Sequence, residues 1–355
     1  MTGFDGMLCS AAAQEIPLPG SATHVTGWLC VEQPGAWGRD VIGDEVLGPE
    51  ITAELAARTK AAHVRPTLIR RPGRNEFNGV RTVLLARTSA EDSWCERFEI
   101  TDLKQLLDLD LHLLNGPAPG IGARVEDPLV LVCAHGKRDQ CCALLGRPIA
   151  ARLVTEFPDR VWECSHTGGH RFAPAVVLLP TGLTYGRVDA DAVITAVEAA
   201  QYGRISLPGL RGRSCYTPVQ QVAELAVAQR LIDETYTERE DPVAVRERSQ
   251  RDEGAPGAVA DAGIHATGRP GLRDSVRTAD MCVGVSDLTV KSAEVDSATS
   301  RNPATFAGAA EVTHRDGRRW LVTAHTVAYA PRQASCGAAP KKATAVVADE
   351  VRLIL

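Results

Sequence analysis

The segment PLVLVCAHGKRDQCC (128–142) decides the fold, because it joins a short apolar run to a polar stretch with three cysteines in all. Residues 128–133 have the composition of a strand that is buried on both faces. The polar residues 134–142 predict a loop. Helical spacing then starts at Pro148, and proline suits the first position of a helix. The apolar face of this helix comprises Ile149, Leu153 and Phe157.

The residues that follow predict the rest of one α/β unit. RVWEC (160–164) is strand-like and precedes the glycine-containing loop HTGGH (166–170). APAVVLLP (173–180) and LTYGRV (183–188) predict a hairpin, since a Thr-Gly pair separates them. A further helix follows, capped by an aspartate and closed by Gly203. The predicted order is therefore β-α-β-β-β-α.

Residues 1–118 show nearly the same order of elements. Strand-like segments occupy 23–32, 64–70, 79–87 and 94–100, and a helix is predicted over 49–62. Asp102 can cap another helix. Cys30 follows the first strand much as Cys133 follows its own, but this half has no matching pair of histidines. We therefore predict two related α/β domains, 1–118 and 119–233, of which only the second carries a metal site.

The remainder of the chain predicts a helix, a linker and a small β-rich module. Thr217 and Pro218 start the helix, and Gln220 completes a capping box with Thr217. Residues 234–275 are rich in charged residues, glycine and alanine, which is typical of a linker. Residues 276–355 form the module, because an Asp-Gly pair between strand-like arms predicts a hairpin there.

The composition excludes several classes of protein. A net charge of -5 gives no basic footprint for nucleic acid. No apolar stretch is long enough to span a membrane, and the first residues do not resemble a signal peptide. The ten cysteines are scattered along 355 residues, which argues against a secreted disulfide framework. We expect a cytoplasmic protein that binds neither nucleic acid nor membrane.

Two pairs of residues are candidate metal ligands. Cys133 and Cys142 are separated by eight residues, and His166 and His170 by three. Each pair follows a predicted strand, so both loops are expected at one edge of the sheet. Thiolates and imidazoles suit zinc and iron–sulfur centres alike. Spacing alone leaves the metal open, and it also leaves Cys141 as a competitor of Cys142.

The motifs CAHGKRDQCC, HTGGHRFAPAVVLLP and LTYGRV resemble those of the sucrase/ferredoxin-like family. The segments 27–40 and 65–74 are also similar to bacterial members. In the family pattern the second cysteine stands nine positions after the first, which selects Cys142. The resemblance implies an α/β fold, in which a related α/β domain precedes a thioredoxin-like ferredoxin domain. It also implies a 2Fe–2S cluster. The implied cluster ligands are Cys133, Cys142, His166 and His170. His135 and Arg138 are expected beside the cluster, or else in a solvated loop.

The resemblance implies an electron-transfer protein, either a redox carrier or a component of an oxidoreductase. No flavin or nicotinamide fingerprint occurs in the sequence, so an external reductase or electron acceptor is expected as partner. Three alternative functions are also compatible with the sequence. They are a structural zinc site, a non-catalytic interaction module built on the residues after 233, and a thiol-based oxidoreductase that uses Cys141.

Histidine ligands predict a pH-dependent potential. Neutral imidazoles in place of two thiolates should raise the midpoint toward the roughly -150 to +300 mV range of Rieske-type centres. A ring N–H that ionises more easily in the oxidised state couples electron uptake to proton uptake. The midpoint potential should therefore fall as pH rises above the pKa of the oxidised form. Redox titrations between about pH 6 and pH 10 test this, and a flat profile contradicts it.

Overall fold

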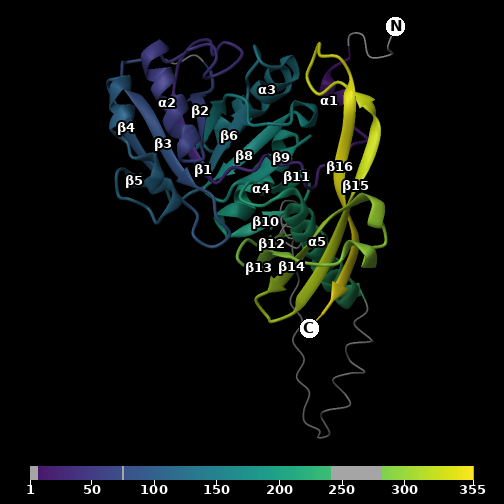
Figure 1. The fold of residues 1–355 in the computed structure, drawn as a ribbon. Helices are drawn as coiled ribbons and strands as arrows, with labels where there is room; N and C mark the ends of the chain where they lie inside the picture. The colour runs from purple at the N-terminus through teal and green to yellow at the C-terminus, as the bar shows by residue number, and fades with distance from the viewer. Residues whose placement is uncertain (1–6, 74–75, 241–281, 355) are drawn as a thin grey trace, which may run out of the picture.

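The computed structural model describes residues 7–73, 76–240 and 282–354, and its largest element is a ten-stranded mixed sheet (Figure 1). The strand order is β11-β9-β8-β6-β7-β2-β1-β3-β4-β5. The strands are β1 (Gly27–Glu32), β2 (Val64–Arg70), β3 (Arg81–Arg87), β4 (Trp94–Ile100), β5 (Ala123–Arg124), β6 (Leu129–Cys133), β7 (Val161–Cys164), β8 (Ala175–Leu179), β9 (Leu183–Gly186) and β11 (Leu210–Arg213). Most of these bounds lie within one or two residues of the predicted strands.

The sheet contains the same arrangement twice. In the first half β1 is parallel to β2 and antiparallel to β3, which pairs with β4. In the second half β6 is parallel to β7 and antiparallel to β8, which pairs with β9. The order β-α-β-β-β and these directions are those of a thioredoxin-like unit. The large mixed α/β sheet and the separate C-terminal sheet confirm the fold class predicted from the sequence.

The two halves join through their edge strands, because β2 pairs with β7 in an antiparallel register. Arg70 lies opposite Glu163 in this register, and its Nε and Nη2 atoms are 2.8 and 2.7 Å from Glu163 Oε2. Such paired donors to a carboxylate fix geometry as well as charge. The halves therefore form one continuous sheet, and their inner faces share a core.

Side chains that alternate along each strand divide the core into layers. One layer lies between the halves and contains residues such as Trp28, Leu131 and Trp162. The outer layers pack under helices, with α2 (Pro49–Ala61) on the first half and both α3 (Gln140–Glu156) and α4 (Ala190–Gln201) on the second. Cys133 belongs to the shared inner layer, so the end of β6 faces the junction of the halves.

The helix α3 begins eight residues earlier than predicted. Asp139 is its N-cap, and the carboxylate accepts a hydrogen bond from the backbone N–H of Cys141. Pro148, predicted as the first helical residue, lies inside the helix instead. A strong cap outweighs one interior proline here. Cys141 and Cys142 therefore lie on the first turn of a helix rather than in a loop.

Two smaller expectations are also corrected. Asp102 does act as a cap, with Gln105 completing a capping box, but the residues after it form two short 3₁₀ segments. These are η1 (Leu103–Asp108) and η2 (Leu111–Asn115), and Asp110 caps the second. A second capping aspartate thus interrupts the predicted helix. Cys30 lies within β1, buried, rather than after it.

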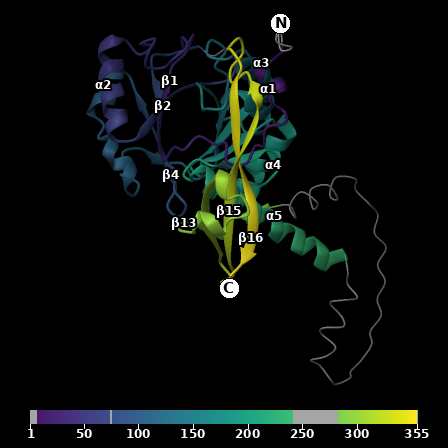
Figure 2. The same cartoon turned by 45° about the vertical axis from the view of Figure 1, so that its right-hand side comes forward.

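The C-terminal sheet contains β13 (Leu288–Ala293), β14 (Phe306–His314), β15 (Arg319–Arg332) and β16 (Lys341–Leu353) in this order. The predicted hairpin around Asp316 is the β14–β15 turn. Helix α5 (Pro218–Glu240) covers this sheet and starts with the predicted capping box. The long β15–β16 hairpin extends along the molecule to α1 (Cys9–Ala12) and α3 (Figures 1 and 2).

A two-stranded sheet pairs β10 (Arg204–Ser206) with β12 (Cys282–Gly284). Of the predicted linker 234–275, residues 234–240 continue α5, and the rest lies outside the described residues. No helix within 7–73, 76–240 and 282–354 combines the length and apolar character needed to cross a membrane.

A buried ion pair ties the two sheets together. Arg213 in β11 bonds Glu224 in α5, and its Nη2 also donates to the Leu288 carbonyl of β13 at 3.3 Å. Both side chains of the pair are fully buried. The Arg213 guanidinium therefore links β11 of the large sheet, the helix α5 and β13, an edge strand of the small sheet.

Replacing Glu224 by leucine should lower the free energy of unfolding by about 3–5 kcal/mol, because it leaves the Arg213 charge buried without its partner. Urea unfolding followed by tryptophan fluorescence measures this. The matched control is Glu54→Leu, which breaks the exposed pair between Glu54 and Arg58 and should cost at most about 1 kcal/mol. Equal losses in the two variants would contradict the anchoring role.

Candidate metal centre

The ends of two parallel strands form the framework of the centre. Cys133 is the last residue of β6, and it pairs in register with Cys164, the last residue of β7. Parallel neighbours end at the same edge, so the segments after them emerge together, as predicted. Helix α3 returns closely to this edge, because Gly146 packs where a Cβ would collide with the Cys133 carbonyl oxygen.

The structure brings the four predicted ligands together. Cys142 Sγ lies 3.6 Å from Nδ1 of His170. Cys133 interacts with both Cys142 and His166, which lower the pKa of its thiol. The rings of His166 and His170 stack with centroids 3.7 Å apart and planes 12° from parallel. Each residue of the set thus touches two others. Cys133, Cys142 and His170 are buried, whereas His166 is partly exposed.

Mutual contact sets the protonation of these groups. The pKa of the Cys133 thiol lies well below its ordinary value, because Cys142 donates a hydrogen bond to it and His166 adds another. The pKa of Cys142 is raised correspondingly by its contacts with Cys133 and Cys141 and by burial. Burial, together with the neighbouring His166, lowers the pKa of His170 to about 4. His170 is therefore neutral at physiological pH, which is the form that binds metal.

The HTGGH loop depends on its two glycines. Gly168 and Gly169 have φ angles of 102° and 74°, which L-residues rarely adopt. A Cβ on either would also collide, at Gly168 with the Thr23 side chain and at Gly169 with Nη2 of Arg211. The loop therefore turns tightly between His166 and His170, so that their rings face each other.

Two arginines hold this loop, the partly buried Arg65 and the fully buried Arg211, and sequence reasoning missed both as site residues. Arg65 donates to the His166 carbonyl at 2.6 Å, and Arg211 donates to the Gly168 carbonyl at 3.2 Å. Burial lowers the pKa of Arg65, and burial with the nearby Arg171 lowers that of Arg211 to about 9. Within the described part of the chain, no carboxylate lies at ion-pair distance from either guanidinium.

The charges that do face these guanidinium groups are those of the thiols. The thiolate of Cys133 acts on both Arg65 and Arg211. Buried cations without carboxylate partners are costly unless negative charge lies nearby. The site is therefore electrostatically arranged for anionic ligands or an anionic group. Arg65 lies in the 65–74 segment noted for its family resemblance, but the sequence contains no signal that its side chain reaches the HTGGH loop.

The two residues expected beside the centre take different positions. The His135 backbone N–H is hydrogen-bonded to the Cys133 sulfur. Its ring accepts from the His166 N–H at Nδ1, 3.2 Å away, and lies 3.0 Å from the Gly38 carbonyl at Nε2. Arg138 is partly exposed and faces Asp40 at 3.9 Å. His135 thus positions His166, whereas Arg138 lies at the surface beside the site.

Cys141, the competitor for the second thiol ligand, has different main contacts, although its sulfur also lies 3.6 Å from the His170 carbonyl oxygen. Its sulfur lies 3.3 Å from that of Cys9 and 2.8 Å from Oδ1 of Asp139. Cys142 instead faces Cys133 and His170. Because consecutive residues of a helix point about 100° apart, one turn of α3 supplies thiols to two different neighbourhoods.

The profile of the sucrase/ferredoxin-like family matches residues 18–212. The chain belongs to the sucrase/ferredoxin-like family. The resemblance inferred from the motifs is thereby confirmed. No curated protein and no solved structure matches the chain. The match covers both halves of the large sheet, whereas α5 and the C-terminal sheet of this sucrase/ferredoxin-like protein lie beyond it.

Adding a methyl group to the loop tests its tight turn. Gly169→Ala should lower the free energy of unfolding by about 1–3 kcal/mol more than Gly203→Ala, because both residues have positive φ but only Gly169 is crowded. Gly203 has a φ of 65° and no heavy atom within 4 Å of its Cβ position. Thermal unfolding of both variants gives the difference. Equal losses would mean that backbone conformation alone requires the glycine.

Proposed function

We propose that this chain binds a 2Fe–2S cluster through Cys133, Cys142, His166 and His170 and transfers single electrons. The observation that carries the proposal is the convergence of one thiol pair and one imidazole pair at a single sheet edge beside two guanidinium groups, those of Arg65 and Arg211. A cluster so held supplies a one-electron couple. Membership of the sucrase/ferredoxin-like family supports a redox role of this kind.

The donor set fits a centre with two metals. Cys133 contacts Cys142, and His166 stacks on His170, so each pair can serve one iron. The thiolate form is already favoured at Cys133 and the neutral imidazole at His170. Both are the forms that coordinate iron. Cys142, whose pKa is raised, would lose its proton when the cluster binds.

The two arginines beside the HTGGH loop favour an iron–sulfur centre over a structural zinc ion. Electron uptake adds one negative charge, whereas the charge of a zinc site does not change. Arg65 and Arg211 donate to carbonyls of the HTGGH loop and interact with the thiol of Cys133, where a unit charge is less screened than in bulk water. These side chains would stabilise the reduced state and raise the potential. They also hold the loop carbonyls, so the imidazoles stay oriented.

The partly exposed His166 marks the side from which electrons would enter or leave. A surface pocket of about 210 Å³ opens beside it. The residues that line it include Arg39, Asp40, Arg65, His135, Arg138 and His166. Three arginines against one aspartate give this opening a positive rim. We expect an external reductase or electron acceptor with an acidic surface to dock there, because complementary charge steers association.

The adjacent cysteines provide a matched pair of variants for the ligand assignment. Cys142→Ser should lower both iron and acid-labile sulfide to less than about a tenth of the wild-type content, because a buried ligand to the cluster is lost. Cys141→Ser should retain most of both. Iron and sulfide analysis of protein purified without oxygen measures the difference. Loss of iron in Cys141→Ser alone would reassign the ligand, and a wild-type protein with neither element would overturn the proposed function.

A further inference from the structure

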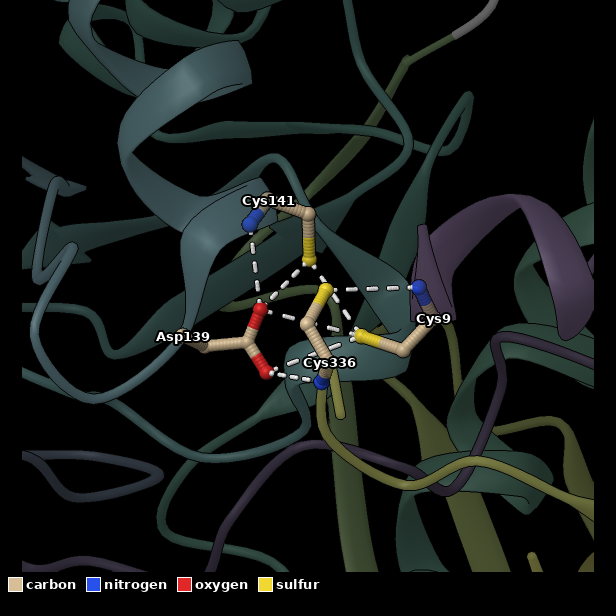
Figure 3. Close-up of side chains that lie close together, drawn as sticks. All are labelled: Cys9, Asp139, Cys141 and Cys336. Carbon is tan, nitrogen blue, oxygen red and sulfur yellow. Dashed lines mark hydrogen bonds between the residues drawn. The ribbon is translucent and has the colours of Figure 1, made fainter. Parts of the chain in front are cut away.

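A second group of metal-binding side chains lies next to the proposed cluster site (Figure 3). It consists of Cys9, Asp139, Cys141 and Cys336, and we call it the Cys9 site. One donor atom from each residue lies within 4.8 Å of all the others. The residues come from the first turn of α1, the start of α3 and the β15–β16 loop. No short motif in the sequence joins them, since Cys9 and Cys336 are 327 positions apart.

The spacing of the donors suits a tetrahedral ion. Zinc–sulfur bonds of about 2.3 Å place two thiolates roughly 3.8 Å apart on a tetrahedron. The Cys9 and Cys141 sulfurs are 3.3 Å apart, and the Cys9 sulfur is 3.7 Å from Oδ1 of Asp139. The four side chains point toward one another around a common centre in Figure 3. Small shifts of the side chains would admit an ion.

The Asp139 carboxylate is already oriented for this purpose. Its Oδ2 accepts hydrogen bonds from the Ser335 hydroxyl at 2.8 Å and from the Cys336 N–H at 3.0 Å. Its Oδ1 is directed at the sulfurs and also accepts from the Cys141 N–H at 3.1 Å. Outer hydrogen bonds of this kind fix a carboxylate ligand in metal sites. The side chain is wholly buried.

Charge gives a second reason for a cation. Among the described residues, no lysine or arginine lies at ion-pair distance from Asp139, and the one basic side chain there is the His170 imidazole, at 3.7 Å. A buried carboxylate packed against three thiols therefore has no permanent positive charge beside it. A divalent cation supplies that charge. The positive end of the 17-residue helix α3 and the Cys9 N–H, 3.4 Å from the Cys336 sulfur, stabilise the remaining negative charge.

We propose that Cys9, Asp139, Cys141 and Cys336 bind one zinc ion at a structural site distinct from the cluster site. Three thiolates and a carboxylate form a closed four-ligand set, which is the pattern of structural rather than catalytic zinc. Thiolate ligands select zinc over magnesium and calcium, and the general order of affinities places zinc above ferrous iron. The half-buried Cys336 leaves a path for the metal to enter.

This site would fasten two segments that are distant in sequence to the cluster region. The ion would join α1 and the β15–β16 loop to the first turn of α3, where Cys142 lies. The long β15–β16 hairpin reaches this point in both views of the molecule (Figures 1 and 2). The C-terminal sheet, which lies beyond the family match, thus contributes one ligand to a centre in the large sheet.

Metal analysis of the full-length chain tests the proposal. We expect about one zinc per chain in wild-type protein purified without oxygen and passed through a chelating resin. Cys9→Ser and Cys336→Ser should each lower zinc at least fivefold while iron stays unchanged. Cys215→Ser is the matched control, because Cys215 is half-buried and packs against the C-terminal sheet core instead. It should keep both metals at wild-type levels.

A second measurement covers the case in which a variant is destabilised. Zinc-depleted wild-type protein should take up one cobalt ion per chain and show thiolate-to-cobalt charge-transfer bands. Cys336→Ser, altered only in a surface loop, should show no such bands although its circular dichroism is native. Three results would overturn the proposal. They are wild-type protein without zinc, zinc that is lost in Cys133→Ser but kept in Cys9→Ser, and a Cys9–Cys141 disulfide in the native chain.

The outcomes also separate this proposal from the proposed function. Iron retained with zinc absent removes the zinc site and leaves the cluster untouched. Zinc retained without iron removes the proposed cluster and leaves the zinc site, provided that Cys9→Ser removes that zinc.

Discussion

The arrangement of the metal-binding residues depends on one hydrogen bond, from the Cys141 N–H to the Asp139 carboxylate. This cap starts α3 at Gln140, directly against the end of β6. It turns two adjacent cysteines onto one helical turn, so that Cys142 faces Cys133 and His170 whereas Cys141 faces Cys9. A helix beginning at Pro148 would leave both thiols in a loop without fixed directions. The positive end of α3 also favours thiolates there.

The joining of two similar halves supplies the other part of the environment. Because β2 pairs with β7, segments of the first half lie over the site of the second. Arg65 and the Gly38 carbonyl come from the first half, and they hold His166 and His135 respectively. The first half therefore contributes to the site although it has no histidine pair of its own. It provides charge and hydrogen bonds at a centre whose ligands lie elsewhere.

The sequence predicted the strands well, because apolar runs such as 64–70 and 94–100 are bounded by polar or glycine residues. It also predicted that Cys133 and the histidines meet, since parallel strands end at one edge. It placed the start of α3 wrongly, because Pro148 suggested an N-terminus while the capping role of Asp139 depends on tertiary context. The placement of Arg65 and Arg211 at the HTGGH loop and the approach of Cys9 to Cys336 arise only from long-range packing, which leaves no local pattern.

The most direct test of the account is the visible and electron paramagnetic resonance spectra of the wild-type protein, purified without oxygen, before and after reduction by dithionite. The account predicts a red-brown protein whose absorption bleaches on reduction. The reduced state should give a signal whose average g-value is lower than that of an all-cysteine 2Fe–2S centre, because two imidazoles replace thiolates. A colourless protein that holds zinc at Cys133, Cys142, His166 and His170 would contradict it, since such a site carries no electrons.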